Sequence, residues 1–181
     1  MIPSLQIKFL AENQVSEELQ SEVNALDALA FSSVDQNEEP GFAGVEWASH
    51  DWMELGFMGD QLVSQLCLLK REIRVGETPT WVAGIGGLAT DPKWQKQGFA
   101  LQLLLKAKGF MKNQMGVPFG LLICSDVMQP YYARNGWKKV AQSLRYVQSG
   151  AHRVLTTCVM ILPLDDQDWP AGEIDLCGLP W

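Results

Sequence analysis

A short glycine-bearing segment between an expected strand and an expected helix constrains this chain most. The segment, Gln95-Lys96-Gln97-Gly98-Phe99-Ala100, follows a strand expected over Thr80–Ala89 and the turn Asp91-Pro92. It opens a helix expected over Leu101–Met115, in which leucines recur at helical spacing. The first N–H groups of a helix have no partner within it, and the helix dipole adds positive potential there. The hexapeptide therefore predicts an anion site at this helix start.

The strand–helix–strand unit around this segment fixes much of the expected fold. Phe119–Cys124 is a short apolar strand, and a right-handed crossover should pair it parallel to Thr80–Ala89. Trp52–Met58 and Gln61–Val75 are two further strands separated by the turn Gly59-Asp60, which predicts an antiparallel meander leading into the parallel pair. The sequence therefore predicts an α/β (α+β) protein, with a mixed sheet and helices on its faces.

The remaining segments supply the outer parts of this fold. We expect a strand over Leu5–Leu10, a helix from Glu17 capped by Ser16, a short helix over Met128–Asn135 ended by Gly136, and one long strand over Val154–Leu164. Residues 32–51 are polar and glycine-bearing, which favours a loop with a short helix. Residues 1–181 are expected to form one domain, because this length permits a sizeable core.

Charge is unevenly distributed along the chain, whose net charge is −7. Residues 1–69 hold one basic and twelve acidic residues, residues 70–153 hold thirteen basic and four acidic residues, and residues 154–181 hold five acidic residues and no basic ones. The basic middle contains the expected anion site, whereas the acidic ends suit a cationic partner. Alternatively, the acids of residues 12–27 only solvate one helix face. A nucleic acid partner is not expected for so acidic a chain.

Neither a membrane, nor secretion, nor a metal is expected from the sequence. No apolar run is long enough to cross a bilayer, and the first four residues lack the blocks of a signal peptide. The cysteines at 67, 124, 158 and 177 show neither zinc nor disulfide spacing. We therefore expect a cytoplasmic protein with reduced thiols, no metal and no membrane partner, and we leave a homodimer open.

The hexapeptide and a second motif together resemble the GNAT superfamily of acyl-CoA N-acyltransferases. That family carries Gln/Arg-x-x-Gly-x-Gly/Ala at the start of the helix after its fourth strand, and Gln95, Gly98 and Ala100 match it. The resemblance covers most of residues 52–164. It implies the GNAT fold, a mixed and mostly antiparallel sheet that is splayed between the fourth and fifth strands, with helices on both faces.

The second motif lies downstream of the hexapeptide. The family often has an Asn, then an Ala, then a Tyr just before a Gly-Phe-like pair. In this chain Ser125 stands at the Asn position and Met128 at the Ala position. Tyr132 and Gly136-Trp137 hold the later positions.

A closer likeness is to the aminoglycoside 2'-N-acetyltransferases. It rests on Asp91–Ala100, Tyr132–Trp137, Val159–Pro163, the chain length and a final tryptophan after a cysteine. One departure concerns a glutamate in the fourth strand of those enzymes, which relays a proton from the substrate amine. Gly86 stands at that place here. The likeness therefore supports the reaction type better than the substrate.

The resemblance implies acetyl-CoA as cosubstrate. In the family the N–H groups of the hexapeptide hold the pyrophosphate, and the end of the fourth strand pairs with the pantetheine arm and polarises the thioester carbonyl. A loop and helix start without a ligand is the alternative. The implied cofactor-binding residues are Leu88, Ala89, Thr90, Gln95, Lys96, Gln97, Gly98, Phe99, Ala100, Ser125 and Met128.

The proton donor and acceptor of such a reaction are predicted unequally well. Tyr132 matches a family position that often protonates the departing thiolate, and we predict it as the general acid. The alternative is a packed core tyrosine, a role that we assign instead to its neighbour Tyr131. No general base is assigned, because several groups or a relaying water fit equally. The candidates are Glu46, His50, Asp51 and Glu54, and a histidine in an acidic loop is often a solvated surface residue.

The acceptor is expected to meet the acidic ends of the chain. Asp175 and the terminal carboxylate of Trp181, if the tail folds back, would join Glu46, His50, Asp51 and Glu54 as substrate-binding groups. The expected reaction is direct attack, in a ternary complex, by a primary amine of a cationic small molecule. An aminoglycoside acceptor would imply antibiotic resistance. The alternatives are a polyamine or peptide amine, or a CoA-binding sensor without turnover.

Overall fold

The structure is a computed structural model that describes residues 5–31 and 41–181. Within these residues one mixed sheet has the strand order β6-β9-β5-β4-β3-β10-β7-β8, and β1 and β2 extend it from β3. The elements are β1 Gln6–Ala11, α1 Glu17–Ala30, β2 Trp52–Met58, β3 Gln61–Val75, β4 Thr78–Thr90, α2 Phe99–Phe110, β5 Phe119–Cys124, α3 Gln129–Arg134, β6 Lys138–Val140, β7 Leu144–Gln148, β8 Ala151–Leu155, β9 Cys158–Pro163 and β10 Ile174–Asp175.

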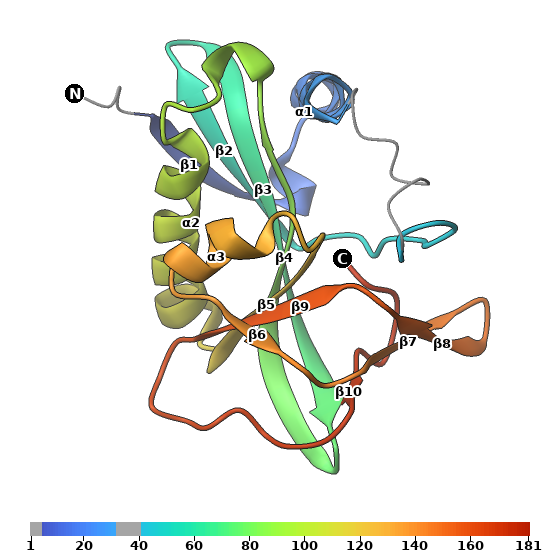
Figure 1. Cartoon of the computed structure of the whole chain (residues 1–181). Helices are drawn as coiled ribbons and strands as arrows, with labels where there is room; N and C mark the ends of the chain where they lie inside the picture. Colours follow the sequence, from blue (N-terminus) through green and yellow to red (C-terminus); the bar gives the residue numbers. More distant parts are fainter. Residues whose placement is uncertain (1–4, 32–40) are drawn as a thin grey trace.

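The central strands follow the expected pattern (Figure 1). β1, β2, β3 and β4 form an antiparallel meander, and β5 pairs parallel to β4 after the α2 crossover. β3 pairs with β2 over its first half and with β10 at Arg74 and Val75, so one long strand joins two parts of the sheet. The prediction of a meander leading into a parallel pair is confirmed.

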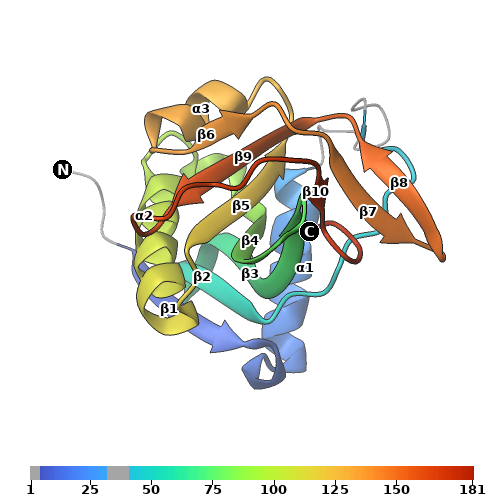
Figure 2. The same ribbon diagram turned by 90° about the horizontal axis from the view of Figure 1, so that it is seen from below.

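Helices α1 and α2 cover opposite faces of β2, β3 and β4 (Figures 1 and 2). Alternation along the strands produces the two interfaces, because successive side chains point to opposite faces. Met53, Leu55 and Phe57 of β2 pack with Val23 and Leu26 of α1. On the other face the core under α2 contains Leu66, Leu68, Ala83, Ile85, Leu103 and Leu104. The prediction of helices on both faces is confirmed.

The start of α1 and the bounds of α2 can be compared with the prediction. The Ser16 hydroxyl accepts from the Leu19 N–H at 3.2 Å, which confirms Ser16 as the cap of α1. Helix α2 begins at Phe99, two residues before the predicted start, and ends at Phe110, where a π-helical turn over Met111–Met115 continues it. None of the helices in residues 5–31 and 41–181 is long and apolar enough to cross a membrane.

The chain after β5 differs from the prediction of a single long strand over Val154–Leu164. That region contains the end of β8 and the whole of β9, separated by Thr156 and Thr157. The Thr157 hydroxyl donates to the Cys124 carbonyl at 2.8 Å, which anchors the break against β5. β6, β7 and β10 were not predicted, because each is short and carries charged residues, and pairing with distant strands stabilises them.

The predicted loop over residues 32–51 is described in part. Residues 32–40 lie outside the described residues, and residues 41–51 contain turns and extended chain without regular strand or helix. This second part passes close to β7, because the side chain of Gln148 donates to the Gly44 carbonyl at 2.9 Å. Segments far apart in sequence therefore meet on the α1 side of the sheet.

Candidate functional site

β4 and β5 separate partway along their length, which creates the opening at the centre of the site. Their parallel pairing runs from Val82 with Phe119 to Ile85 with Leu122 and then stops. Beyond this point β4 continues to Thr90 without a partner strand on the edge that faces β5. β5 continues to Cys124, where it pairs only with β9. The polar backbone groups of residues 86–90 that face β5 therefore have no ladder partner there. An extended ligand arm can pair with them as an added strand.

A β-bulge in β4 produces this separation. Residues 65 and 67 of β3 oppose Ala89 and Gly86 of β4, so β4 has one extra residue between the two pairs. Gly87 lies in this interval at φ 58°, a left-handed conformation that glycine adopts without a Cβ penalty. The bulge bends β4 away from β5 directly where the pairing ends.

The start of α2 forms a backbone cradle beside the opening. Gly98 is the N-cap at φ 81° and ψ 14°, and no side chain caps the helix. Lys96 also has a positive φ, 61°, so the chain turns tightly before the helix begins. The first N–H groups of α2 thus remain available to an anion, because they have no acceptor within the helix.

The loop that leads into this cradle is held by its own side chains. Asp91 is buried and its carboxylate accepts from the Lys93 N–H at 2.9 Å. The side chain of Gln95 donates to the Thr90 carbonyl at 3.2 Å, linking the end of β4 to the loop. Trp94 packs on Phe99 with ring centroids 5.9 Å apart. The hexapeptide is therefore preorganised at the end of β4.

The other side of the opening is formed by the end of β5 and the turn into α3. The Met128 N–H donates to the Ser125 carbonyl at 3.0 Å, and the Tyr132 N–H donates to the Met128 carbonyl at 3.3 Å. These bonds place Ser125 and Met128 directly after β5, across the opening from residues 86–90. The predicted cofactor-binding residues of both motifs thus lie around a single opening.

Tyr132 is more buried than the sequence analysis assumed, and Tyr131 is less buried. Tyr132 is 8% exposed and belongs to the core that contains Cys124 and Trp137, whereas Tyr131 is half-buried at its edge. The assignment of Tyr131 as the core residue of this pair is therefore wrong. Burial raises the pKa of Tyr132 well above its ordinary value, as do the neighbouring Cys124 and Tyr131. The hydroxyl is thus a proton donor that stays protonated at neutral pH.

The opposite, α1-facing side of the opening is covered by residues 176–181. The Trp181 indole N–H donates to the Leu121 carbonyl at 3.2 Å, and its ring lies over Gly84. A Cβ at Gly84 would lie 2.1 Å from that ring, and one at Gly86 would lie 3.1 Å from the Trp181 carbonyl carbon. These two glycines therefore leave the room that this segment occupies.

Arg71 holds this segment in place from β3. Its guanidinium donates to the Leu179 carbonyl at 2.6 Å and lies 5.1 Å from the centroid of the Trp181 ring. Burial lowers the pKa of Arg71, while Cys177 and Asp51 act in the opposite direction. Arg71 was not singled out from the sequence. A lone arginine in a strand does not indicate that it will donate a hydrogen bond to a backbone carbonyl about a hundred residues later in the chain.

Residues 41–51 and β7 complete the wall that residues 176–181 begin. The Ala48 N–H donates to the Pro180 carbonyl at 2.7 Å, and the Val147 N–H donates to the Gly178 carbonyl at 3.0 Å. The Glu46 N–H donates to the side chain of Gln148 at 3.0 Å. We call these three segments, residues 41–51, 144–148 and 176–181, the acceptor-side wall.

The predicted acceptor residues of the loop occupy different environments in this wall. The side chain of Glu46 is exposed, and so is that of Asp51, whose carboxylate accepts from the Lys70 N–H at 2.7 Å. His50 is half-buried, and its buried Nε2 atom has no hydrogen-bond partner in the part of the chain that the structure describes. Glu46 and Asp51 therefore remain accessible to a cation.

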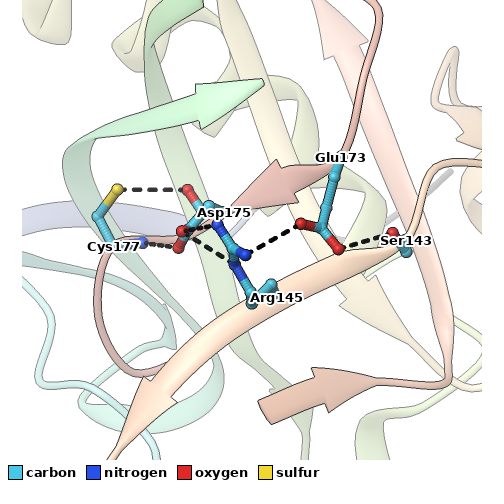
Figure 3. A network of polar contacts seen from close by, with 5 residues as sticks. All are labelled: Ser143, Arg145, Glu173, Asp175 and Cys177. Carbon is cyan, nitrogen blue, oxygen red and sulfur yellow. Dashed lines mark hydrogen bonds and ion pairs between the residues drawn. The ribbon is translucent and has the colours of Figure 1, made fainter. Parts of the chain in front are cut away.

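Asp175 is occupied by partners within the protein (Figure 3). Its carboxylate accepts from the Arg145 guanidinium at 2.8 Å and from the Cys177 N–H at 2.9 Å. Burial opposes ionisation, but these two bonds and the charge of Arg145 together lower the pKa of Asp175. Arg145 also contacts Glu173 at 3.3 Å. Asp175 thus fixes β10 to β7 instead of presenting a free carboxylate.

Glu54 lies on the opposite face of the sheet from the acceptor-side wall. It is 0% exposed on β2, on the face that α2 covers, and neither carboxylate oxygen has a hydrogen-bond partner among the described residues. Burial raises its pKa from 4.5 to about 9, and Lys106 of α2 opposes this shift only in part. The sheet separates Glu54 from the acceptor-side wall, so the structure does not bring it together with Glu46, His50 and Asp51.

A separate hollow of about 320 Å³ lies at the far end of β4. Its lining includes Thr80, Trp81, Phe119 and Asp168. Thr80, Trp81 and Phe119 are at the start of β4 and β5 and Asp168 follows β9, whereas the bulge, the cradle and Tyr132 surround the ends of β4 and β5. The hollow therefore lies outside the site that the opening defines.

The fold and this opening define an acyl-CoA-dependent N-acetyltransferase. A family model described as an acetyltransferase (GNAT) domain matches residues 13–140. The chain therefore belongs to the GNAT acetyltransferase family. A search of curated proteins found no match.

Solved structures share the fold at low sequence identity. Escherichia coli ElaA is 16% identical with a TM-score of 0.63, over 88% of this chain and 99% of that one. The GNAT family N-acetyltransferase YhbS from Escherichia coli, in complex with CoA, is 18% identical with a TM-score of 0.62, over 98% and 97%. A GNAT family acetyltransferase from Brucella melitensis, in complex with acetyl-CoA, is 14% identical with a TM-score of 0.61, over 93% and 94%.

Proposed function

We propose that this protein transfers an acetyl group from acetyl-CoA to a primary amine of a cationic small molecule, an aminoglycoside being the leading candidate. The observation that carries the proposal is the opening between β4 and β5, which is flanked by the cradle at Gly98 and by Tyr132. Two of the similar solved structures hold CoA or acetyl-CoA. The residues of this chain fit such a ligand, because an uncapped helix start meets an unpaired strand edge.

Each part of the site has a distinct task in the proposed reaction. Acetyl-CoA supplies an acetyl thioester, which an amine can attack directly. The N–H groups at residues 97–100 would hold the pyrophosphate, and the backbone of residues 88–90 would bind the pantetheine arm and polarise the carbonyl. Tyr132 would donate its proton to the departing thiolate, because its phenol is protonated at neutral pH and lies beside the end of β5.

A cationic acceptor is supported by the charges of the acceptor-side wall. Glu46 and Asp51 have exposed carboxylates there, and Trp47 is 40% exposed beside them. Carboxylates and an aromatic face bind an amine-rich molecule by charge and by cation–π contact. A polyamine fits the same chemistry, so it is the second candidate acceptor.

An assay of CoA release tests this proposal. The protein would be mixed with acetyl-CoA and, separately, with kanamycin A, spermidine and a lysine-containing peptide, and free thiol would be followed with a chromogenic disulfide. We expect turnover with kanamycin A or spermidine. Turnover with the peptide alone would rule out a small cationic acceptor. Binding of acetyl-CoA with no turnover on any amine would instead indicate a CoA sensor.

A further inference from the structure

Asp27 is a carboxylate on the α1 side of the sheet that the sequence did not single out. It lies in the last turn of α1, is half-buried, and accepts a hydrogen bond from the side chain of Gln65 at 2.6 Å. Gln65 is 1% exposed and pairs directly with Ala89 of β4. Asp27 is therefore one side chain away from the segment of β4 that lines the opening.

The bulge at Gly87 belongs to the same cluster. The Cys67 sulfur would lie 3.2 Å from a Cβ at Gly87, so this side chain covers the bulge on the α1 side. Burial raises the pKa of Cys67 to about 12, and the charge of Asp27 raises it further. Asp27, Gln65 and Cys67 thus surround the bulge on the face opposite α2, where the acceptor-side wall also lies.

Gln65 is arranged to hold a carboxylate and has unused capacity. Its amide nitrogen faces Asp27, because a carboxylate can accept but cannot donate when it is ionised. Its amide oxygen is buried and has no hydrogen-bond partner among the described residues. A buried oxygen left unpaired costs about 1–3 kcal/mol, so this arrangement of Gln65 is destabilising unless a further donor reaches it.

We propose that Asp27 binds the acceptor ammonium and accepts its proton, and that Gln65 is the residue that positions it. The inference rests on the proposed acetyl transfer. The ammonium N–H bond breaks, its proton moves to the carboxylate, and the neutral amine keeps the electron pair that attacks the thioester. The protonated Asp27 then returns its proton to water. This assigns a base to a site in which Gly86 replaces the glutamate of β4.

The environment of Asp27 suits this role. Burial raises its pKa above the ordinary value of 3.8, and the hydrogen bond from Gln65 acts against this rise. A base with a raised pKa accepts a proton more readily near neutral pH. Among the described residues, Cys67 is the ionisable group facing it from β3, and it is neutral at pH 7. β4 contributes the glycines at 86 and 87 near this cluster, and neither carries an ionisable group.

Three variants of the full chain separate the roles. Asp27→Asn keeps the shape and the bond from Gln65 but removes the base, Asp27→Glu restores a carboxylate, and Gln65→Leu removes the positioning bond. Glu22→Gln is the control, because it removes the same charge from an exposed position of the same helix. Acetyl-CoA binding, spermidine binding by calorimetry, and pH–rate profiles with spermidine and kanamycin A would be measured for each.

We expect Asp27→Asn to lower kcat/KM by about 100-fold or more and to remove the acidic limb of the profile, with acetyl-CoA affinity unchanged. Asp27→Glu should recover part of the rate. Gln65→Leu should move the acidic limb to higher pH, because the bond that lowers the pKa of Asp27 is lost. Asp27→Asn with the wild-type profile would overturn the proposal.

Failure of the proposed function gives a different pattern. A wild-type protein that does not bind acetyl-CoA, or binds it without turnover, contradicts the acetyl transfer. Spermidine binding by the wild type and by the variants then still tests whether Asp27 binds an ammonium group. Weaker binding by Asp27→Asn than by Glu22→Gln supports an ammonium site, whereas equal binding, or none in the wild type, overturns it.

Discussion

The two sides of the β4–β5 opening are built in different ways. The side that we propose for the cofactor comes from residues 86–100 and 124–132, two stretches that each run through a strand end, a turn and a helix start. The side that we propose for the acceptor comes from Asp27, Arg71 and the acceptor-side wall, which are spread over the whole chain. Local backbone geometry creates the first, and contacts between distant segments create the second.

This difference explains why the cofactor is easier to infer than the acceptor. Backbone N–H groups bind phosphate whatever the surrounding sequence, provided that a tight turn precedes the helix. An acceptor is recognised by side chains, whose positions depend on which loops come together. A change to the backbone cradle at Gly98 should therefore abolish acetyl-CoA binding, whereas the loss of a single side-chain group on either side should alter rate or KM. The following predictions test that division.

The largest effect is expected for Gly98→Glu on the cofactor side. A glutamate at φ 81° is strained and brings a negative charge to the site of the pyrophosphate. We expect acetyl-CoA binding to fall below detection in calorimetry. Gly109→Glu is the control, since it adds the same charge to α2 at a position where a Cβ meets nothing within 4 Å. Equal acetyl-CoA binding by both variants would show that the turn at Gly98 does not hold the pyrophosphate.

Tyr132→Phe should have the next largest effect, on rate alone. Loss of a general acid typically costs about 100-fold in kcat, and the phenyl ring preserves the packing with Trp137. Acetyl-CoA affinity should not change. The matched control is Tyr131→Phe, which removes a half-buried hydroxyl from the adjacent residue. A Tyr132→Phe protein with full activity would exclude this residue as the acid.

Glu54→Gln should change stability and leave both sides of the opening intact. The pKa of Glu54 is about 9 in the folded protein and 4.5 ordinarily, so the folded state holds the proton more tightly. Its contribution to stability is complete below pH 4.5 and is lost as pH rises to 9. The slope between these values is about −1.4 kcal/mol per pH unit.

Denaturant unfolding at several pH values measures this slope. Glu54→Gln should flatten the decline between pH 5 and pH 9 and be more stable than the wild type at pH 8. Glu72→Gln, at an exposed position of β3, is the control and should follow the wild-type curve. A Glu54→Gln variant that lost acceptor turnover with normal stability would return Glu54 to the acceptor side.

Arg71→Gln should have the smallest effect, on the acceptor side. It releases the Leu179 carbonyl and the Trp181 ring, so residues 176–181 should exchange amide hydrogen faster while α2 is unchanged. We expect KM for spermidine to rise about tenfold, close to the loss of one charged hydrogen bond. Arg74→Gln removes the same charge from an exposed position of β3. Identical exchange in both variants would show that Arg71 does not hold the segment.

Much of the fold was predictable because its signals are local. β2, β3 and β5 have the predicted bounds, and Ser16 caps α1 as expected, since alternation and capping act within a few residues. β8 and β9 were predicted as one strand, although β8 is exposed and β9 is buried on both faces. That distinction depends on the neighbours each strand finds.

The site divides in the same way. The hexapeptide and Tyr132 were singled out from sequence, and the structure brings them to one opening, while their binding roles stay predictions. Glu54 and Asp175 were placed on the acceptor side for their charge. One lies under α2 and the other pairs with Arg145. Charge can be counted in a sequence, but the face on which a carboxylate lies and the partner that occupies it cannot.

The sequence by itself determined the order of elements, the parallel crossover through α2 and the tight turn at Gly98, because each depends on residues close together in the chain. The tertiary structure alone decided what covers the other side of the opening. Trp181 rests on Gly84, Arg71 holds Leu179, and Gln65 holds Asp27. Such contacts join residues up to about a hundred positions apart, and only folding brings them within hydrogen-bond distance.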